Sequence, residues 1–88
     1  MNIDLTNLNE LGKGVQLEAV KEDGYSVQFI DNPDKEIQLE AVKENVFAIQ
    51  YIKNPDKEVQ LEAVKEDGRS IRFINNPNRE ILDILKQY

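Results

Sequence analysis

One 22-residue phrase is written three times in this chain, and this repeat constrains the fold more than any other feature. The copies are residues 15–36 (VQLEAVKEDGYSVQFIDNPDKE), 37–58 (IQLEAVKENVFAIQYIKNPDKE) and 59–80 (VQLEAVKEDGRSIRFINNPNRE). A fixed period of this length is typical of a solenoid, in which each unit buries its apolar surface against its neighbours. We therefore expect one helical-repeat domain over residues 1–88, with degenerate caps at residues 1–14 and 81–88.

Both ends of the chain look like eroded repeats. Counting back by 22 residues aligns Ile3, Leu5 and Leu8 with Tyr25, Val27 and Ile30. Residues 81–88 begin with the apolar residue that starts each repeat, but the QLEAV sequence does not follow. Terminal repeats are atypical because one of their sides faces water, so we expect a capping structure at each end.

Each repeat carries the signals of one helix. Asn-Pro pairs stand at residues 32–33, 54–55 and 76–77, and they combine a favoured N-cap with a proline suited to the first helical position. The first of these pairs predicts a helix from Pro33 to about Glu44. Asp-Gly at residues 23–24 and 67–68 predicts helix ends, whereas Asn45 is expected to take the left-handed conformation in the copy that lacks this glycine.

One polar residue falls in the middle of the apolar arc of this helix. At about 100° per residue, Gln38 lies inside the arc formed by Ile37, Leu39, Ala41 and Val42, and Gln16 and Gln60 repeat it. A buried amide without partners costs about 1–3 kcal/mol. We expect these glutamines to bond to the turn backbone or to each other along the stack. The alternative is an exposed glutamine that lines a groove.

The segment from Tyr25 to Ile30, with its copies, fits two structures. Its β-branched and aromatic content suits a strand, which would give a horseshoe of strands and helices like that of leucine-rich repeats. On a helical wheel, however, Phe29 and Val27 share the apolar arc and only Gln28 faces outward. Strand alternation would point the adjacent Phe29 and Ile30 to opposite sides. The pattern favours a second helix, and therefore an all-α solenoid of three helix-pair repeats.

The repeat also resembles a known family in its wording. Successive copies read QLEAVKEDGYSVQFI and QLEAVKENVFAIQYI, which is similar to the DUF4116 repeats and their pattern LxAVKxNGxALxY(I/A). The resemblance covers residues 15–80 and implies an all-helical repeat array. The family has no assigned chemistry, so it implies no catalytic or binding residues. The chain departs from the pattern at Val46, where glycine is expected, and at Arg69 and Arg72, which replace an aromatic residue and glutamine.

The composition argues against several kinds of chemistry. The chain has no cysteine and no histidine, so it offers no thiolate, disulfide or conventional zinc site. Its hydroxyl groups have no histidine base, and its carboxylates follow the repeat as a solvated face. We expect a protein that is not an enzyme and holds no cofactor or metal. The net charge of −6 argues against nucleic-acid binding, and no apolar run approaches the ~18 residues of a membrane span.

Some positions differ between copies that are otherwise nearly identical. Packing between repeats does not fix the residue at these positions, so we take them as the candidate partner-binding residues. They lie on the short second segment and the turn after it: Tyr25, Phe47 and Arg69; Gln28, Gln50 and Arg72; Asp31, Lys53 and Asn75. The net charge of the copies runs −4, −1 and 0 in chain order. We expect Arg69 and Arg72 to grip a carboxylate or phosphate. Drift on an exposed rim after duplication would leave the same pattern.

The leading functional prediction is a non-catalytic scaffold that binds a protein partner through the second helices and the following turns. One alternative is a small acidic decoy that mimics the charge of nucleic acid, suggested by the net charge and by the columns of Glu18, Glu40 and Glu62. Another is a module that associates end to end through its caps. Because no signal peptide is recognisable, we expect a cytoplasmic location, with delivery to a host by a signal-less route left open.

Overall fold

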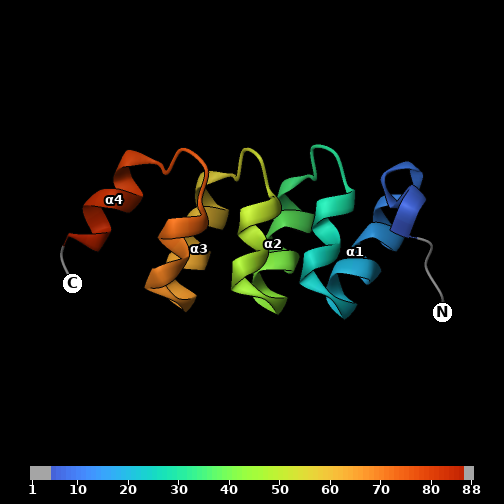
Figure 1. The fold of residues 1–88 in the computed structure, drawn as a ribbon, viewed down its shortest axis with the longest axis horizontal. Coiled ribbons are helices and arrows are strands. Elements are labelled where there is room, and N and C mark those ends of the chain that lie inside the picture. Colours follow the sequence, from blue (N-terminus) through green and yellow to red (C-terminus); the bar gives the residue numbers. More distant parts are fainter. Residues whose placement is uncertain (1–4, 87–88) are drawn as a thin grey trace.

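Long and short helices alternate along a single axis. Within residues 5–86, which the computed structural model describes, every regular element is helical. The order, with η marking a 3-10 helix, is η1 (Leu5–Glu10), α1 (Lys13–Glu22), η2 (Gly24–Phe29), α2 (Lys35–Glu44), η3 (Val46–Tyr51), α3 (Lys57–Glu66), η4 (Gly68–Phe73) and α4 (Arg79–Leu85). Successive pairs lie side by side in a rod with extents of 44 × 19 × 17 Å (Figure 1). The prediction of an all-α helical repeat is confirmed, and the strand alternative is wrong.

The period of the sequence is also the period of the rod. The α-helices of the described residues begin at residues 13, 35, 57 and 79. The central helix α2 contacts α1 on one side and α3 on the other, which is why it buries a wide arc that includes Ile37, Ala41 and Val42. None of the helices in residues 5–86 is long and apolar enough to cross a membrane.

The α-helices begin two residues later than the Asn-Pro signal predicts. The N-cap of α2 is Asp34, whose Oδ1 accepts a hydrogen bond from the Ile37 N–H at 3.0 Å. Asp56 and Asn78 cap α3 and α4 by accepting from the Glu58 N–H and the Glu80 N–H, respectively. The asparagine before the proline forms the turn instead: Asn32 has φ = 50°, a left-handed conformation that asparagine adopts more readily than most residues. The prediction that Asn32 is the N-cap is therefore wrong.

The Asp34 carboxylate is held in its charged form by this capping role. The Ile37 backbone N–H lowers the pKa of Asp34 below its ordinary value, and the Lys13 ammonium from the preceding helix, 3.2 Å away, adds to the effect. A carboxylate at a helix N-terminus also interacts favourably with the helix dipole. Asp34 thus links the start of α2 to α1.

A single polar residue ends each α-helix and begins the next short helix. The backbone N–H of Asn45 donates to the Ala41 carbonyl, while its side chain accepts from the Phe47 N–H at 3.1 Å. Asp23 and Asp67 act likewise at the starts of η2 and η4. Asn45 has φ = −153°, which is extended backbone, so the prediction that it takes the left-handed conformation is wrong.

The 3-10 geometry of the short helices turns one aromatic column outward. With three residues per turn, positions three apart lie directly above one another. Val27 and Ile30 therefore share the buried side, while Gln28 and Phe29 are both exposed. Phe29 is 42% exposed, so the prediction that it lies in the buried apolar arc is wrong. That prediction assumed an α-helix with 3.6 residues per turn, whereas η2 is a 3-10 helix with three.

One apolar core runs the length of the rod. Its residues come from every described repeat, and the largest of them are fully buried: Leu8, Val20, Val27, Ile37, Val42, Ile49, Ile52, Val59 and Ile81. Leu8 lies in η1 and is fully buried, as its alignment with Ile30 predicts. Ile3 lies outside the described residues. The core is shared between neighbours, as expected for repeats that pack only against each other.

The buried glutamines tie each repeat to the next. Gln38, only 7% exposed, donates from Nε2 to the Pro33 carbonyl at 2.8 Å, and its Oε1 accepts from the Asp56 N–H at 2.9 Å. Gln60 repeats this bridge one repeat further along, between Pro55 and Asn78. The prediction that these glutamines bond to the turn backbone is confirmed. A polar group that is buried this deeply requires such partners.

Replacing Ser70 with alanine is expected to stabilise the protein by about 1 kcal/mol. Ser70 is fully buried, and its Oγ has no hydrogen-bond partner among the described residues. Ala48 fills the same position in the preceding repeat and is equally buried, so the smaller side chain fits there. Chemical denaturation of both proteins measures the gain. The reciprocal change Ala48→Ser should cost a similar amount, and a loss of stability in Ser70→Ala would contradict the prediction.

Candidate partner-binding surface

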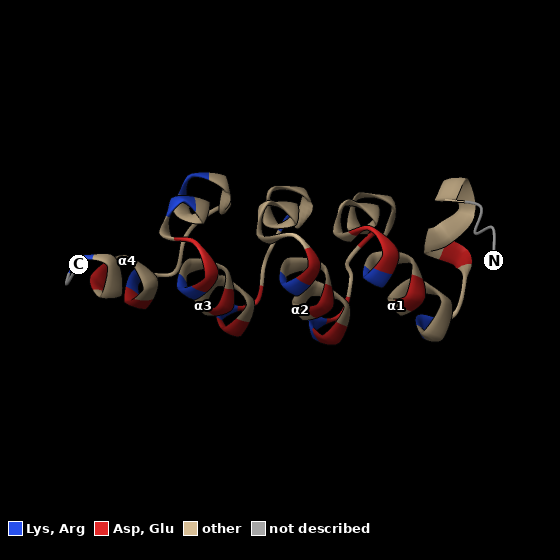
Figure 2. Ribbon diagram, turned by 90° about the horizontal axis from the view of Figure 1, so that it is seen from below, with Lys and Arg blue, Asp and Glu red and all other residues tan. Residues whose placement is uncertain are grey.

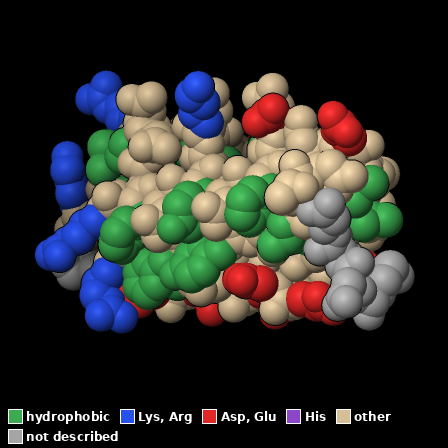
Figure 3. Space-filling model, turned by 45° about the vertical axis from the view of Figure 1, so that its right-hand side comes forward, with side chains coloured by type: hydrophobic (Ala, Val, Ile, Leu, Met, Phe, Trp, Pro, Cys, Tyr) green, Lys and Arg blue, Asp and Glu red, His purple; other side chains and the backbone are tan. Residues whose placement is uncertain are grey.

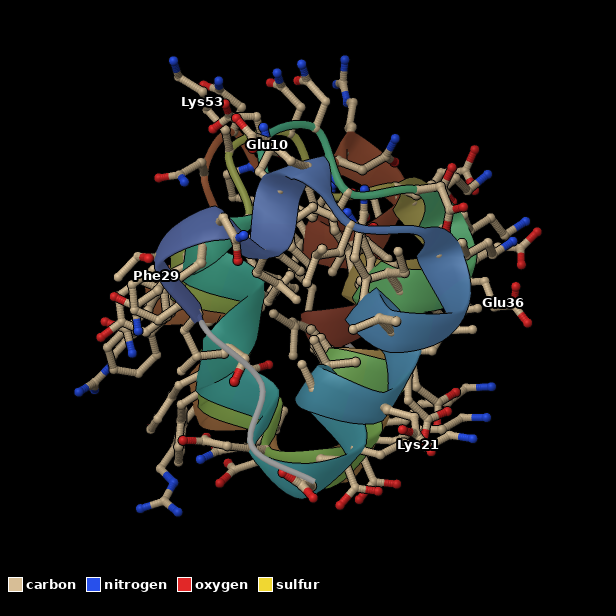
Figure 4. The ribbon with its side chains drawn as sticks, turned by 90° about the vertical axis from the view of Figure 1, so that its right-hand side faces the viewer. Glu10, Lys21, Phe29, Glu36 and Lys53 are labelled. Carbon is tan, nitrogen blue, oxygen red and sulfur yellow. The ribbon has the colours of Figure 1, made fainter. Side chains whose placement is uncertain are left out.

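The short helices η2, η3 and η4 form one long side of the rod, and aromatic residues gather along it. We call Tyr25, Phe29, Phe47, Tyr51 and Phe73 the aromatic band. Phe29, Tyr51 and Phe73 occupy the same repeat position and are 42%, 43% and 38% exposed. Figure 3 shows hydrophobic side chains running along this side as a nearly continuous strip. In the view along the rod, Phe29 points to one side while Lys21 and Glu36 point to the other (Figure 4).

Edge-to-face contacts between aromatic rings connect adjacent repeats within the band. The ring centroids of Tyr25 and Tyr51 are 5.5 Å apart at an interplanar angle of 87°. Phe47 and Phe73 repeat the arrangement at 5.3 Å and 72°. Such pairs contribute about 0.5–1.5 kcal/mol beyond the area that they bury. Four of the five rings of the band are therefore paired across repeats within the single chain.

Charge is concentrated on the opposite side, where the α-helices lie. Lysines at the start of each helix pair with a glutamate of the next: Lys13 with Glu36, Lys35 with Glu58 and Lys57 with Glu80, at 2.5, 2.8 and 2.6 Å. Figure 2 shows acidic and basic residues alternating on α1, α2 and α3, whereas the short helices are mostly uncharged until η4. In the part of the chain that is described, no three carboxylates are grouped so as to hold a metal ion.

Three of the nine predicted partner-binding residues line one groove. Gln28, Asp31 and Lys53 surround a space of about 550 Å³ between two successive Asn-Pro turns, next to Tyr51 of the aromatic band. Asp31 is held in place by Asn9, whose side-chain Oδ1 accepts from the Asp31 N–H at 2.7 Å. The groove therefore adjoins the band and adds one acidic and one basic group to it.

The remaining predicted residues lie on the short helices or the last turn. Tyr25 and Phe47 are half-buried members of the band, and Gln50 is exposed beside them. Asn75 lies in the turn after η4, where its side chain reaches the Ile52 carbonyl at 3.4 Å. The predicted residues therefore lie on the short helices of the band or on the turns that follow them.

The two arginines of η4 differ in how far they are available to a partner. Arg69 is held by two neighbours: its Nη2 lies 2.7 Å from Oδ2 of Asp67 in its own repeat, and its guanidinium lies 5.9 Å from the ring centroid of Phe47 in the preceding repeat. The Arg69 guanidinium lowers the pKa of Asp67 below its ordinary value. Arg72 is exposed and has no ion pair within residues 5–86. Arg72 is therefore the more accessible cation of the two.

Reasoning from sequence missed the column of Phe29, Tyr51 and Phe73. The sequence does contain evidence for this column, because the same repeat position is aromatic in all three copies. An α-helical wheel, however, places that position on the buried side. The spacing of three between Val27 and Ile30 is the spacing of a buried 3-10 side. With that period, the adjacent aromatic residue faces outward.

Comparisons with known proteins bear on the family. The sequence model of the "Domain of unknown function (DUF4116)" matches residues 13–55, which include α1, η2, α2 and η3. The searches of curated proteins and of solved structures found no match. The resemblance to the DUF4116 family is thus confirmed over two successive helix pairs, and residues 13–55 are similar to this domain of unknown function.

Proposed function

We propose that this protein is a non-catalytic scaffold in the cytoplasm that binds a protein partner through the aromatic band and the turns beside it. A repeat rod offers a long, regular surface without needing a catalytic site. The single observation that carries the proposal is the exposure of Phe29, Tyr51 and Phe73 at one repeated position. Contiguous exposed apolar surface of this kind marks interaction sites on water-soluble folds.

The distribution of charge supports this proposal over mimicry of nucleic acid. A mimic needs a surface of carboxylates without cations among them, because the potential of a phosphate backbone is continuous. On the α-helical side, lysines intervene at every repeat in pairs such as Lys35–Glu58. On the other side, η2 and η3 carry no acidic residue between their caps.

A photoreactive amino acid placed at Phe29 is expected to crosslink to a protein partner, whereas the same group at Lys21 is not. The two side chains point to opposite sides of the rod (Figure 4), so each reports on one face. The experiment is performed in cells that produce the protein, and products are identified by mass spectrometry. Equal crosslinking from both positions, or none from Phe29, would contradict the proposal.

A further inference from the structure

We propose that the partner of the aromatic band is a second copy of this chain, bound side by side and antiparallel. The inference rests on the proposed function of this face and specifies its partner. In such a dimer, η3 of one copy lies on η3 of the other, and η2 of each copy faces η4 of its partner. The contact is closed, so that assembly stops at two copies.

The size of the face suits a dimer. The short helices lie along one long side of the rod, which is 44 Å long and 19 Å wide (Figure 1). The whole side therefore measures about 800 Å² in projection, which sets an upper limit on a flat contact and is comparable with the share that each partner contributes to an interface of standard size. The centre of this side is aromatic, which matches the composition of well-packed interface cores.

Charge at the two ends of the band selects the antiparallel arrangement. Next to η2, Asp23 and Asp31 are exposed, and neither has an ion pair within the described residues. At the other end, Arg72 on η4 also lacks an ion pair in that part of the chain. Figure 3 shows the same polarity, with basic side chains gathered at the C-terminal end and acidic ones toward the N-terminal half. An antiparallel copy places Arg72 opposite Gln28, three residues from Asp31, and Asp31 opposite the uncharged Asn75. A parallel copy would instead place Arg72 opposite Arg72 and Asp31 opposite Asp31, which are like charges.

The two-fold symmetry of the dimer determines which residues of the two copies face each other. Position 72 in η4 is the repeat equivalent of position 28 in η2, with position 50 halfway between them. A two-fold axis through η3 therefore places Arg72 of one copy opposite Gln28 of the other. Tyr51, which is 43% exposed in the single chain, lies close to this axis and contributes twice to the contact.

Sedimentation equilibrium tests the dimer directly. The chain has a mass of 10.2 kDa, and the native protein should approach twice this mass, without larger species, as its concentration rises. Tyr51→Ser should weaken the dimer by at least about 30-fold, as expected for an aromatic residue at the centre of an interface. Leu82→Ser is the matched control, because Leu82 is 41% exposed on α4 and outside the band.

Charge reversal tests the antiparallel arrangement. Arg72→Glu should weaken the dimer about tenfold, and adding Gln28→Arg should restore it, because the new carboxylate of each copy then faces the new guanidinium of the other. Gln28→Arg alone should weaken the dimer, since it opposes Arg72. Circular dichroism verifies that each variant keeps its helices.

Three results would overturn the inference. They are a native protein that remains a monomer, species larger than two copies that disappear with Leu82→Ser, and a double variant that is no tighter than Arg72→Glu alone. A monomer that still crosslinks to another protein from Phe29 would overturn the dimer and leave the proposed function standing. Absence of any crosslink from Phe29 would remove the proposed function itself.

Discussion

Replacing Gln38 with glutamate is expected to lower the free energy of unfolding at neutral pH by about 3–5 kcal/mol. A carboxylate can still accept from the Asp56 N–H, but it cannot donate to the Pro33 carbonyl, which lies 2.8 Å from Nε2. It therefore places an uncompensated charge against a carbonyl oxygen at a position that is 7% exposed. Small domains are stable by only about 5–15 kcal/mol, so urea denaturation should detect the change readily.

The pH dependence of Gln38→Glu provides a second test. Burial and the facing carbonyl should raise the pKa of the introduced carboxyl in the folded state above the value of about 4.3 that it has in the unfolded chain. The folded state then binds more protons than the unfolded state between these two values, so stability rises as pH falls through that window. Below the unfolded value the protonated carboxyl can donate to Pro33, and the deficit relative to the native protein should be smallest there.

Gln50→Glu is the matched control for this prediction. Gln50 is exposed on η3, and its side chain bonds to the Phe47 carbonyl of its own short helix, at 3.0 Å. The same change of charge there should alter stability by less than about 0.5 kcal/mol. Equal losses at residues 38 and 50 would show that the bridge between repeats is not what makes Gln38 important.

The sequence predicts the repeat architecture well because several levels of the pattern agree. The strict spacing of 22 residues appears in the structure as α-helices that begin 22 residues apart. Apolar positions that recur with it, such as Val20, Val42 and Val64, form one buried row. Gln38 is the polar residue within the apolar face of α2. Its hydrogen bonds could be predicted because a buried amide without partners would be costly.

Details that depend on backbone geometry could not be predicted in the same way. Asn32 and Asp34 both suit an N-cap by propensity, and only the turn decides that Asn32 bends the chain while Asp34 caps the helix. Similarly, a wheel of 3.6 residues per turn cannot place Phe29 correctly in a helix of three. A six-residue segment is too short for its own apolar pattern to distinguish these two periods.

The sequence points to the short helices as a candidate surface, but it does not reveal all of the residues exposed there. Comparing the copies directs attention to the short helices, because residues there are released from the packing that fixes the α-helices. It also favours positions that vary, and so it overlooks Tyr51, whose column is aromatic in every copy. The pairing of Arg69 with Asp67 two residues earlier depends on side-chain geometry that no spacing rule supplies.

Replacing Gly24 with alanine is expected to destabilise the protein by about 1–3 kcal/mol through overpacking. Gly24 is buried where η2 meets the end of α2. A Cβ atom there would lie 2.5 Å from the Ala41 carbonyl oxygen and 3.2 Å from the Asn45 Cβ. The nearest of these atoms belongs to the backbone of the neighbouring repeat, so one helix pair must move relative to the next. Thermal or chemical denaturation measures the loss.

Gly68→Ala separates this effect from the general cost of altering a glycine. Gly68 opens η4 as Gly24 opens η2, but an added Cβ would come no closer than 3.9 Å to the Leu85 side chain. Neither glycine has a positive φ, so alanine is conformationally acceptable at both, and Gly68→Ala should be neutral or stabilising by up to about 1 kcal/mol. Val46 occupies the same position in η3, which shows that a side chain is accepted there when the next repeat leaves room. Equal losses at residues 24 and 68 would mean that close approach to α2 is not the reason for glycine at position 24.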